Sequence, residues 1–222
     1  MKLLKLHKQS SPKEDWMLFV GTEHLNASNR TGSNEFLFQL NIRAGEKAIS
    51  IAAYDSAAKC FEKATIHILS RSDPWESNYD VVLSTYRKYA DVLLRQGDYE
   101  QGECVAQTLL KNAKSIDDKL DTLVSLCVAL GKQYKQQESM DLSLKTLQKL
   151  REYPKTKAGV IAGIGSDMLA VNRYFKTHTD EDILKLPLIT SERKKRVIQL
   201  MLSTTYQVRD PCLTFCFSMS TY

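Results

Sequence analysis

Apolar side chains recur at every third or fourth position along most of the chain after Glu35. This spacing places them on one face of an α-helix, whereas a strand would alternate them at every second position. Residues 35–69 contain no proline and hold two alanine-rich stretches that are separated near residues 53–55. The pattern therefore predicts two consecutive helices, which the serine, aspartate and proline of residues 70–74 bring to an end.

Two more helix pairs are predicted downstream. The second pair begins near Trp75 and turns at Gly97-Asp98, which interrupts two amphipathic stretches. The third pair covers residues 117–151, breaks between residues 131 and 137, and is closed by Pro154. Because each break is short, each pair is expected to form an antiparallel hairpin.

The two ends of the chain differ in character. Residues 157–176 predict one further helix, and residues 191–206 predict another after the Leu186-Pro187 break. Asp210-Pro211 has the residue types of the cap and first turn of a last helix. Residues 1–34 are mostly polar and irregular, so they are expected to be an N-terminal tail or the end of a preceding module.

The hairpins carry a divergent form of the tetratricopeptide pattern, in which small residues on one helix accept large residues from the next. Equivalent positions are Ala57, Gly102 and Met140, about 40 residues apart, which is longer than the standard period of about 34 residues. The residues expected to pack the repeats together are Gly45, Ala48, Tyr54, Ala57, Phe61, Ala64, Ala90, Tyr99, Gly102 and Ala106.

The expected fold is therefore all-α, a tetratricopeptide-like superhelical array of antiparallel helix pairs. Residues 35–154 would form three hairpins, and residues 155–222 would form further helices of the same array, expected to be truncated.

Five short stretches resemble the helical region behind the ATPase module of large signalling proteins. They are residues 40–48 (LNIRAGEKA), 52–59 (AAYDSAAK), 73–76 (DPWE), 97–103 (GDYEQGE) and 182–190 (DILKLPLIT). In that family a serine/threonine kinase domain, a STAND-type (AAA-type) ATPase, a helical repeat region, a GAF domain and a histidine kinase follow one another. The resemblance covers roughly residues 16–222 and implies that this chain is a piece of such an architecture.

The catalytic parts of that family are missing from this chain. It has no GxxxxGK[ST] phosphate loop, no kinase glycine loop or HRD motif, and no histidine-kinase motif. The ATPase and kinase chemistry of the similar proteins therefore does not carry over to these residues.

Composition adds few constraints. The 222 residues include 31 Lys and Arg against 26 Asp and Glu, a net charge of +5 that does not require nucleic acid as a partner. The N-terminus lacks the continuous apolar stretch of a secretory signal, and no apolar run is long enough for a membrane helix. An odd number of cysteines suits reduced thiols in a cytoplasmic protein; these are Cys60, Cys104, Cys127, Cys212 and Cys216.

Two motifs hint at ligand binding but are better explained by packing. Residues 159–167 (GVIAGIGSD) are rich in glycine, yet they fit neither the Walker nor the dinucleotide spacing and follow no strand, which favours close helix packing or a local helix break. Cys212 and Cys216 lie one helical turn apart, but no further ligands are near them in sequence, which favours core thiols over a metal site. The four histidines are dispersed.

Two other groups leave alternatives open. The basic run Arg193-Lys194-Lys195-Arg196 suits either a solvated helix face, which we favour, or a site for an anionic partner. Tyr86 and Tyr89 have helical spacing and belong either to the core of the second hairpin, which we favour, or to a partner groove of the array.

These patterns predict a non-catalytic protein-interaction or scaffold module, and the resemblance relates it to the regulatory arm of a signalling ATPase and kinase. Expected partners are other proteins or adjoining ATPase and kinase domains, with no cofactor, metal, membrane or specific nucleic acid. The alternative is a fragment of a multidomain ATP-binding serine/threonine or histidine kinase whose catalytic domains lie outside this chain. A third possibility is an adaptor that binds a peptide terminus.

Overall fold

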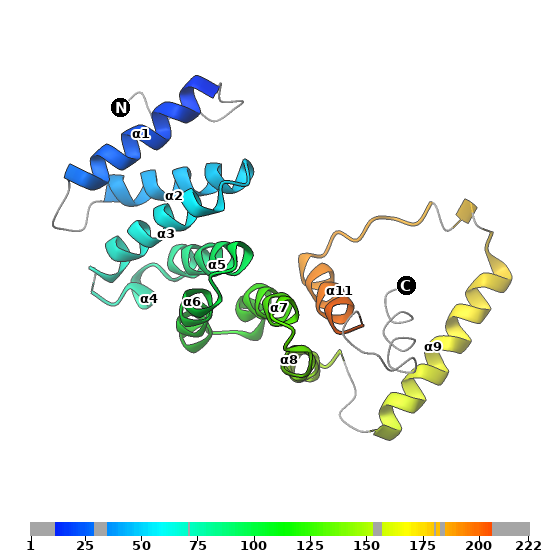
Figure 1. Ribbon diagram of the computed structural model, residues 1–222. Helices are drawn as coiled ribbons and strands as arrows, with labels where there is room; N and C mark the ends of the chain where they lie inside the picture. Colours follow the sequence, from blue (N-terminus) through cyan, green and yellow to red (C-terminus); the bar gives the residue numbers. More distant parts are fainter. Residues whose placement is uncertain are drawn as a thin grey trace. The chain divides into compact units, whose positions relative to one another are not determined.

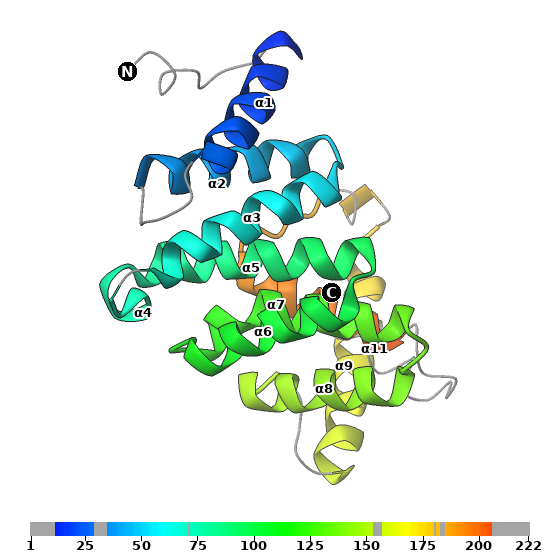
Figure 2. The ribbon, with the colours of Figure 1, turned by 60° about the vertical axis from the view of Figure 1, so that its left-hand side comes forward.

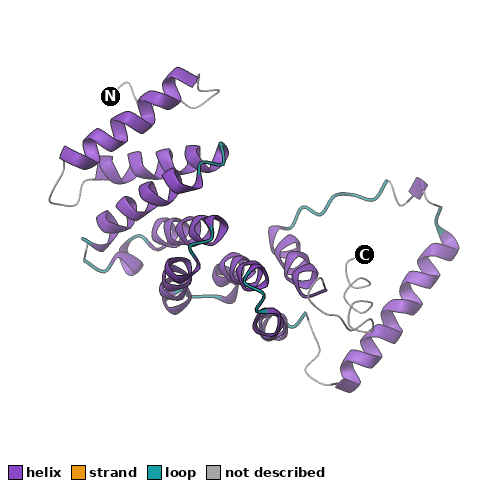
Figure 3. Ribbon diagram, in the orientation of Figure 1, coloured by secondary structure: helices purple, strands orange, loops and turns teal. Residues whose placement is uncertain are grey.

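Helices make up most of the described residues, as the sequence pattern predicts (Figure 1). The computed structural model describes residues 12–28, 35–70, 72–152, 157–179, 181–182 and 185–205, and these ranges contain no β-strand (Figure 3). The helices are α1 (Pro12–Ser28), α2 (Glu35–Ser50), α3 (Tyr54–Leu69), α4 (Pro74–Ser77), α5 (Tyr79–Gln96), α6 (Tyr99–Asn112), α7 (Ile116–Lys132), α8 (Gln136–Leu150), α9 (Lys157–Thr177) and α11 (Glu192–Thr205). The expected all-α class is confirmed.

The chain divides between Asn112 and Ala113 into two compact units. In the first unit α1 packs on α2, the α2–α3 pair packs through α3 on α5, and α5 pairs with α6 (Figure 2). In the second unit α7 pairs with α8, and α11 packs on both. The third hairpin, α7 and α8, therefore lies in the same compact unit as α11.

Four of the helices end with the same backbone conformation. At each of four helix ends a residue adopts a left-handed φ: Ala52 (57°), Gly97 (93°), Tyr134 (61°) and Arg151 (63°). The amide of the next residue then donates back to a carbonyl of the last turn, as from Asp98 to Leu93 at 3.0 Å. This is the usual way to satisfy the unpaired carbonyls of a helix end, and glycine adopts it most readily.

Helix α1 differs from the expected irregular tail. Phe19 packs against the core of the first unit, and Thr22 is buried. The Asn26 and Asn41 side chains exchange two hydrogen bonds of 2.9 Å, and the Asn41 amide also donates to the Leu37 carbonyl at 2.8 Å. Because the apolar residues of α1 do not fall on one face, periodicity alone gave no signal for this helix.

Helix α9 confirms the helix expected at residues 157–176, but not the explanation of its glycines. It continues without a break through residues 159–167, and a Cβ added at Gly163 or Gly165 would meet no described atom within 4 Å. Among the described residues, close packing therefore does not account for Gly163 and Gly165, and the helix does not break at either of them. No described side chain of α9 is buried.

None of the described helices combines the length and the apolar character needed to cross a membrane.

Candidate functional site

The first hairpin brings its small and large residues together. Gly45 of α2 faces Phe61 of α3 so closely that an added Cβ would lie 2.8 Å from the tip of the ring. Phe61 is completely buried, and the alanines around it leave room for the two helices to approach. Three of these alanines, Ala48, Ala57 and Ala64, are fully buried, while Tyr54 at the start of α3 is half-buried.

The second hairpin shows the same kind of approach. An added Cβ at Gly102 of α6 would lie 2.8 Å from a methyl group of Leu94 and 3.2 Å from its backbone nitrogen. Ala90 of α5 and Ala106 of α6 are buried, and Tyr99 at the first turn of α6 is half-buried. All ten residues expected to pack the repeats are thus part of the first unit.

Tyr86 and Tyr89 belong to the core of this hairpin. Their side chains are only 5% and 4% exposed. The Tyr86 ring lies 5.2 Å from that of Trp75, and the Tyr89 hydroxyl accepts a hydrogen bond of 2.9 Å from Gln101. Burial raises the pKa of Tyr89 to about 12. Side chains this deeply buried do not line an open groove, so of the two alternatives the core is correct.

The described part of the chain holds no candidate metal site. No three histidine, cysteine or acidic side chains of the described ranges converge as metal ligands. Burial raises the pKa of both Cys60 and Cys127 to about 11, so these thiols stay protonated at neutral pH. The pair Cys212 and Cys216 lies outside the described residues.

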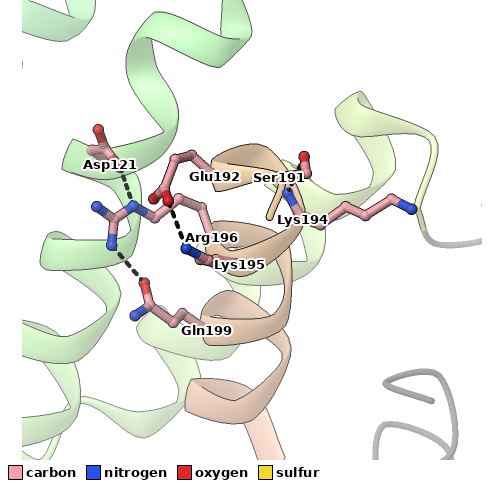
Figure 4. Close-up of polar contacts among 7 residues, drawn as sticks. All are labelled: Asp121, Ser191, Glu192, Lys194, Lys195, Arg196 and Gln199. Carbon is pink, nitrogen blue, oxygen red and sulfur yellow. Dashed lines mark hydrogen bonds and ion pairs between the residues drawn. The ribbon is translucent and has the colours of Figure 1, made fainter. Parts of the chain in front are cut away.

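The basic run at residues 193–196 lies where α11 meets α7 (Figure 4). Arg196 forms an ion pair with Asp121 of α7 and donates to Gln199 at 2.9 Å. Arg193 reaches Asp117, one turn earlier on α7, at 3.0 Å. The two arginines remain at the surface, Arg193 exposed and Arg196 half-buried, and each also pairs with a carboxylate of this same chain.

The lysines of the run behave differently. Lys195 pairs within α11 with Glu192 at 2.7 Å, and this hydrogen bond lowers the pKa of the Glu192 carboxyl. Ser191 precedes the helix, and its hydroxyl accepts from the Lys194 amide at 3.4 Å. Lys194 and Lys195 are exposed, as a solvated face requires.

Beneath the arginines, α11 completes an apolar core. Its Val197, Leu200 and Met201 are buried against residues of the α7–α8 pair. The core residues of that pair are Leu120, Val124, Cys127, Leu147 and Leu150. We call this surface of α7 and α8, together with Asp117 and Asp121, the docking face. On this face one amphipathic helix packs against two others from an earlier part of the sequence.

Sequence reasoning named the arginines but missed their partners. The signal was present, since residues 193, 196, 197, 200 and 201 fall on one side of a helix, and so do 117, 120, 121 and 124. The arginines on the face of α11 and the aspartates on the face of α7 have opposite charges, and this was the only indication in the sequence that the two faces meet.

No protein family, characterised protein or solved structure matches this chain. The resemblance to the helical region of STAND-type signalling proteins therefore stays a prediction.

Proposed function

We propose that this chain is a non-catalytic helical-repeat module that serves as a protein-interaction scaffold, related to the regulatory arm of a signalling ATPase and kinase. The observation that carries this proposal is the succession of helix pairs joined by short turns, with a glycine at the closest approach of each of the first two pairs. Such pairs are the building units of repeat arrays, whose extended surfaces bind other proteins.

In this proposal the pairs stack as a tetratricopeptide-like superhelix in the cytoplasm. Its partners are other proteins, or ATPase and kinase domains that adjoin it in a longer chain. The interaction role is supported by large apolar side chains left exposed on the first unit, among them Trp16, Phe36 and Leu69. Exposed apolar residues indicate a binding surface where they form a contiguous patch.

The alternative is that the chain is one part of a multidomain ATP-binding kinase, and the resembling stretches such as residues 40–48 favour it. Long-read sequencing of messenger RNA containing this reading frame separates the two. A transcript that also encodes a STAND-type ATPase and a histidine kinase supports the arm of an enzyme. A transcript that encodes only this chain supports a separate scaffold and contradicts the relation to the kinase.

Activity of the purified chain provides a second test. We expect no release of phosphate from ATP above that of an unrelated helical protein purified in the same way. Hydrolysis that saturates with ATP and is lost when the chain is unfolded would refute the non-catalytic assignment.

A further inference from the structure

Helix α11 reaches the docking face as a segment from a distant part of the sequence. Forty-one residues separate the end of α8 at Leu150 from the start of α11 at Glu192, and α9 lies between them. Even so, α11 rather than α9 supplies the side chains that close the core of the second unit. The α7–α8 pair thus binds the apolar face of α11, as amphipathic helices are bound in a common mode of peptide recognition.

The contact has both an apolar centre and a charged edge. Val197, Leu200 and Met201 fill the centre, and burial of three such side chains is the main source of affinity. At the edge, Arg193 and Arg196 meet Asp117 and Asp121. Two arginines three residues apart on one helix match two carboxylates four residues apart on the other, so the charges also select the register in which α11 docks.

The segment before α11 makes little contribution to holding it. Residues 185–191 have no regular structure and are exposed, and Leu188 is 91% exposed. The side chains described for α9 are exposed or half-buried. Among the described residues, the contacts that hold α11 therefore come from its own buried face and its arginines rather than from residues 185–191.

We propose that the docking face binds α11 of a second copy of this chain in place of its own, so that two copies exchange α11 and form a dimer. An exchanged α11 makes the same apolar contacts and the same two ion pairs, so exchange requires no new surface. In the monomer, the segment before α11 keeps α11 near its own docking face at a certain effective concentration. The exchanged dimer competes with this monomer, so the fraction of dimer rises with protein concentration. This proposal deepens the proposed function and rests on it, since it names one partner of the interaction module.

Charge reversal on one side of the contact tests the exchange. In one variant, D117R/D121R, the docking face becomes basic; in the other, R193D/R196D, α11 becomes acidic. In each variant alone, α11 and the docking face carry charges of the same sign. They therefore repel each other both within one chain and between two identical copies. We expect each to remain a monomer whose α11 amides exchange hydrogen rapidly. Mixed in equal amounts, the two variants have complementary charges only between different chains, so we expect a heterodimer with twice the monomer mass.

Light scattering after size-exclusion chromatography measures the mass, and native mass spectrometry with one variant isotope-labelled identifies the heterodimer. The control is the fourfold variant D117R/D121R/R193D/R196D, in which both charges are reversed and α11 closes again on its own chain. It should be a protected monomer, and it should not pair with either double variant. All the substituted side chains lie at the edge of the apolar core, and circular dichroism checks that the helices persist.

Two results would overturn the proposal. If the mixture keeps the monomer mass while α11 is protected in the fourfold variant, the ion pairs are real but α11 does not exchange. If α11 is unprotected in the fourfold variant, the charges do not direct docking at all. Neither result bears on the absence of ATP hydrolysis or on the transcript, so the proposed function can survive the failure of this inference.

Discussion

Replacing Gly45 with alanine tests the closest approach of helices α2 and α3. The new methyl group would lie 2.8, 3.0 and 3.1 Å from three carbon atoms of the Phe61 ring. Carbon atoms attract each other best at about 3.5–4.0 Å, so all three contacts are repulsive. Since Phe61 is completely buried, its ring has no solvent space into which it can turn.

Two opposing effects set the size of the change. Alanine is favoured over glycine inside a helix by about 1 kcal/mol, because glycine loses more backbone entropy on folding. Forcing an extra carbon into a filled core costs about 1–3 kcal/mol. We therefore expect Gly45→Ala to lower the free energy of unfolding of the first unit by about 1 kcal/mol, the difference between these two effects.

The chain offers a convenient assay for this unit. Its two tryptophans, Trp16 and Trp75, both lie before residue 113, so their fluorescence in a urea titration reports unfolding of the first unit. The matched control is Gly21→Ala in α1, because a Cβ at Gly21 would meet no described atom within 4 Å. There the helical preference acts alone, and we expect a gain of up to about 1 kcal/mol.

The contact with Phe61 can be isolated by a double-mutant cycle. In a Phe61→Leu background the ring is gone, so adding Gly45→Ala should no longer destabilise the unit. If Gly45→Ala stabilises the wild-type chain as much as Gly21→Ala does, the close approach of α2 and α3 described above is wrong.

Three further predictions concern the second unit. Tyr134 has a left-handed φ and is 84% exposed, so Tyr134→Gly should raise the free energy of unfolding by about 1 kcal/mol in a urea titration followed by circular dichroism; no gain would argue against the strained turn. Leu200→Ala should lower it by about 2–5 kcal/mol and expose the amides of α11 to hydrogen exchange, whereas Leu202→Ala, on the exposed side of α11, should change it by less than about 0.5 kcal/mol. Burial raises the pKa of Cys127 from 9.0 to about 11, so the folded chain keeps a proton that the unfolded chain loses; stability should be full below pH 9 and fall towards pH 11, and Cys127→Ala should remove that part of the decline.

The positions of most helices were predictable because their signals are local. The break expected near residues 53–55 corresponds to a turn at 51–53, and the one expected at 131–137 corresponds to a turn at 133–135. At Gly97 the turn could be read directly, since glycine adopts a left-handed φ without strain. Ala52, Tyr134 and Arg151 adopt the same conformation without glycine, so no glycine at these positions marked the helix ends in the sequence.

The pairing of distant helices was not predictable in the same way. Apolar residues at 197, 200 and 201 showed that α11 has a face to bury, but several other helices have similar faces. The run at 193–196 was favoured as a solvated surface because most charged runs are solvated, and nothing near it in sequence is acidic except Glu192. Its partners, Asp117 and Asp121, lie more than 70 residues earlier.

The sequence by itself determined that this chain is helical, where most of its helices begin and end, and which residues let the helices of the first two hairpins approach. These properties follow from side-chain period, turn residues and residue size, all of which act over a few positions. Only the tertiary structure decided that α1 belongs to the first unit, that the third hairpin belongs with α11, and that Arg193 and Arg196 bind carboxylates of their own chain. Those choices depend on which buried faces and charges fit together in space, and sequence separation carries no information about that fit.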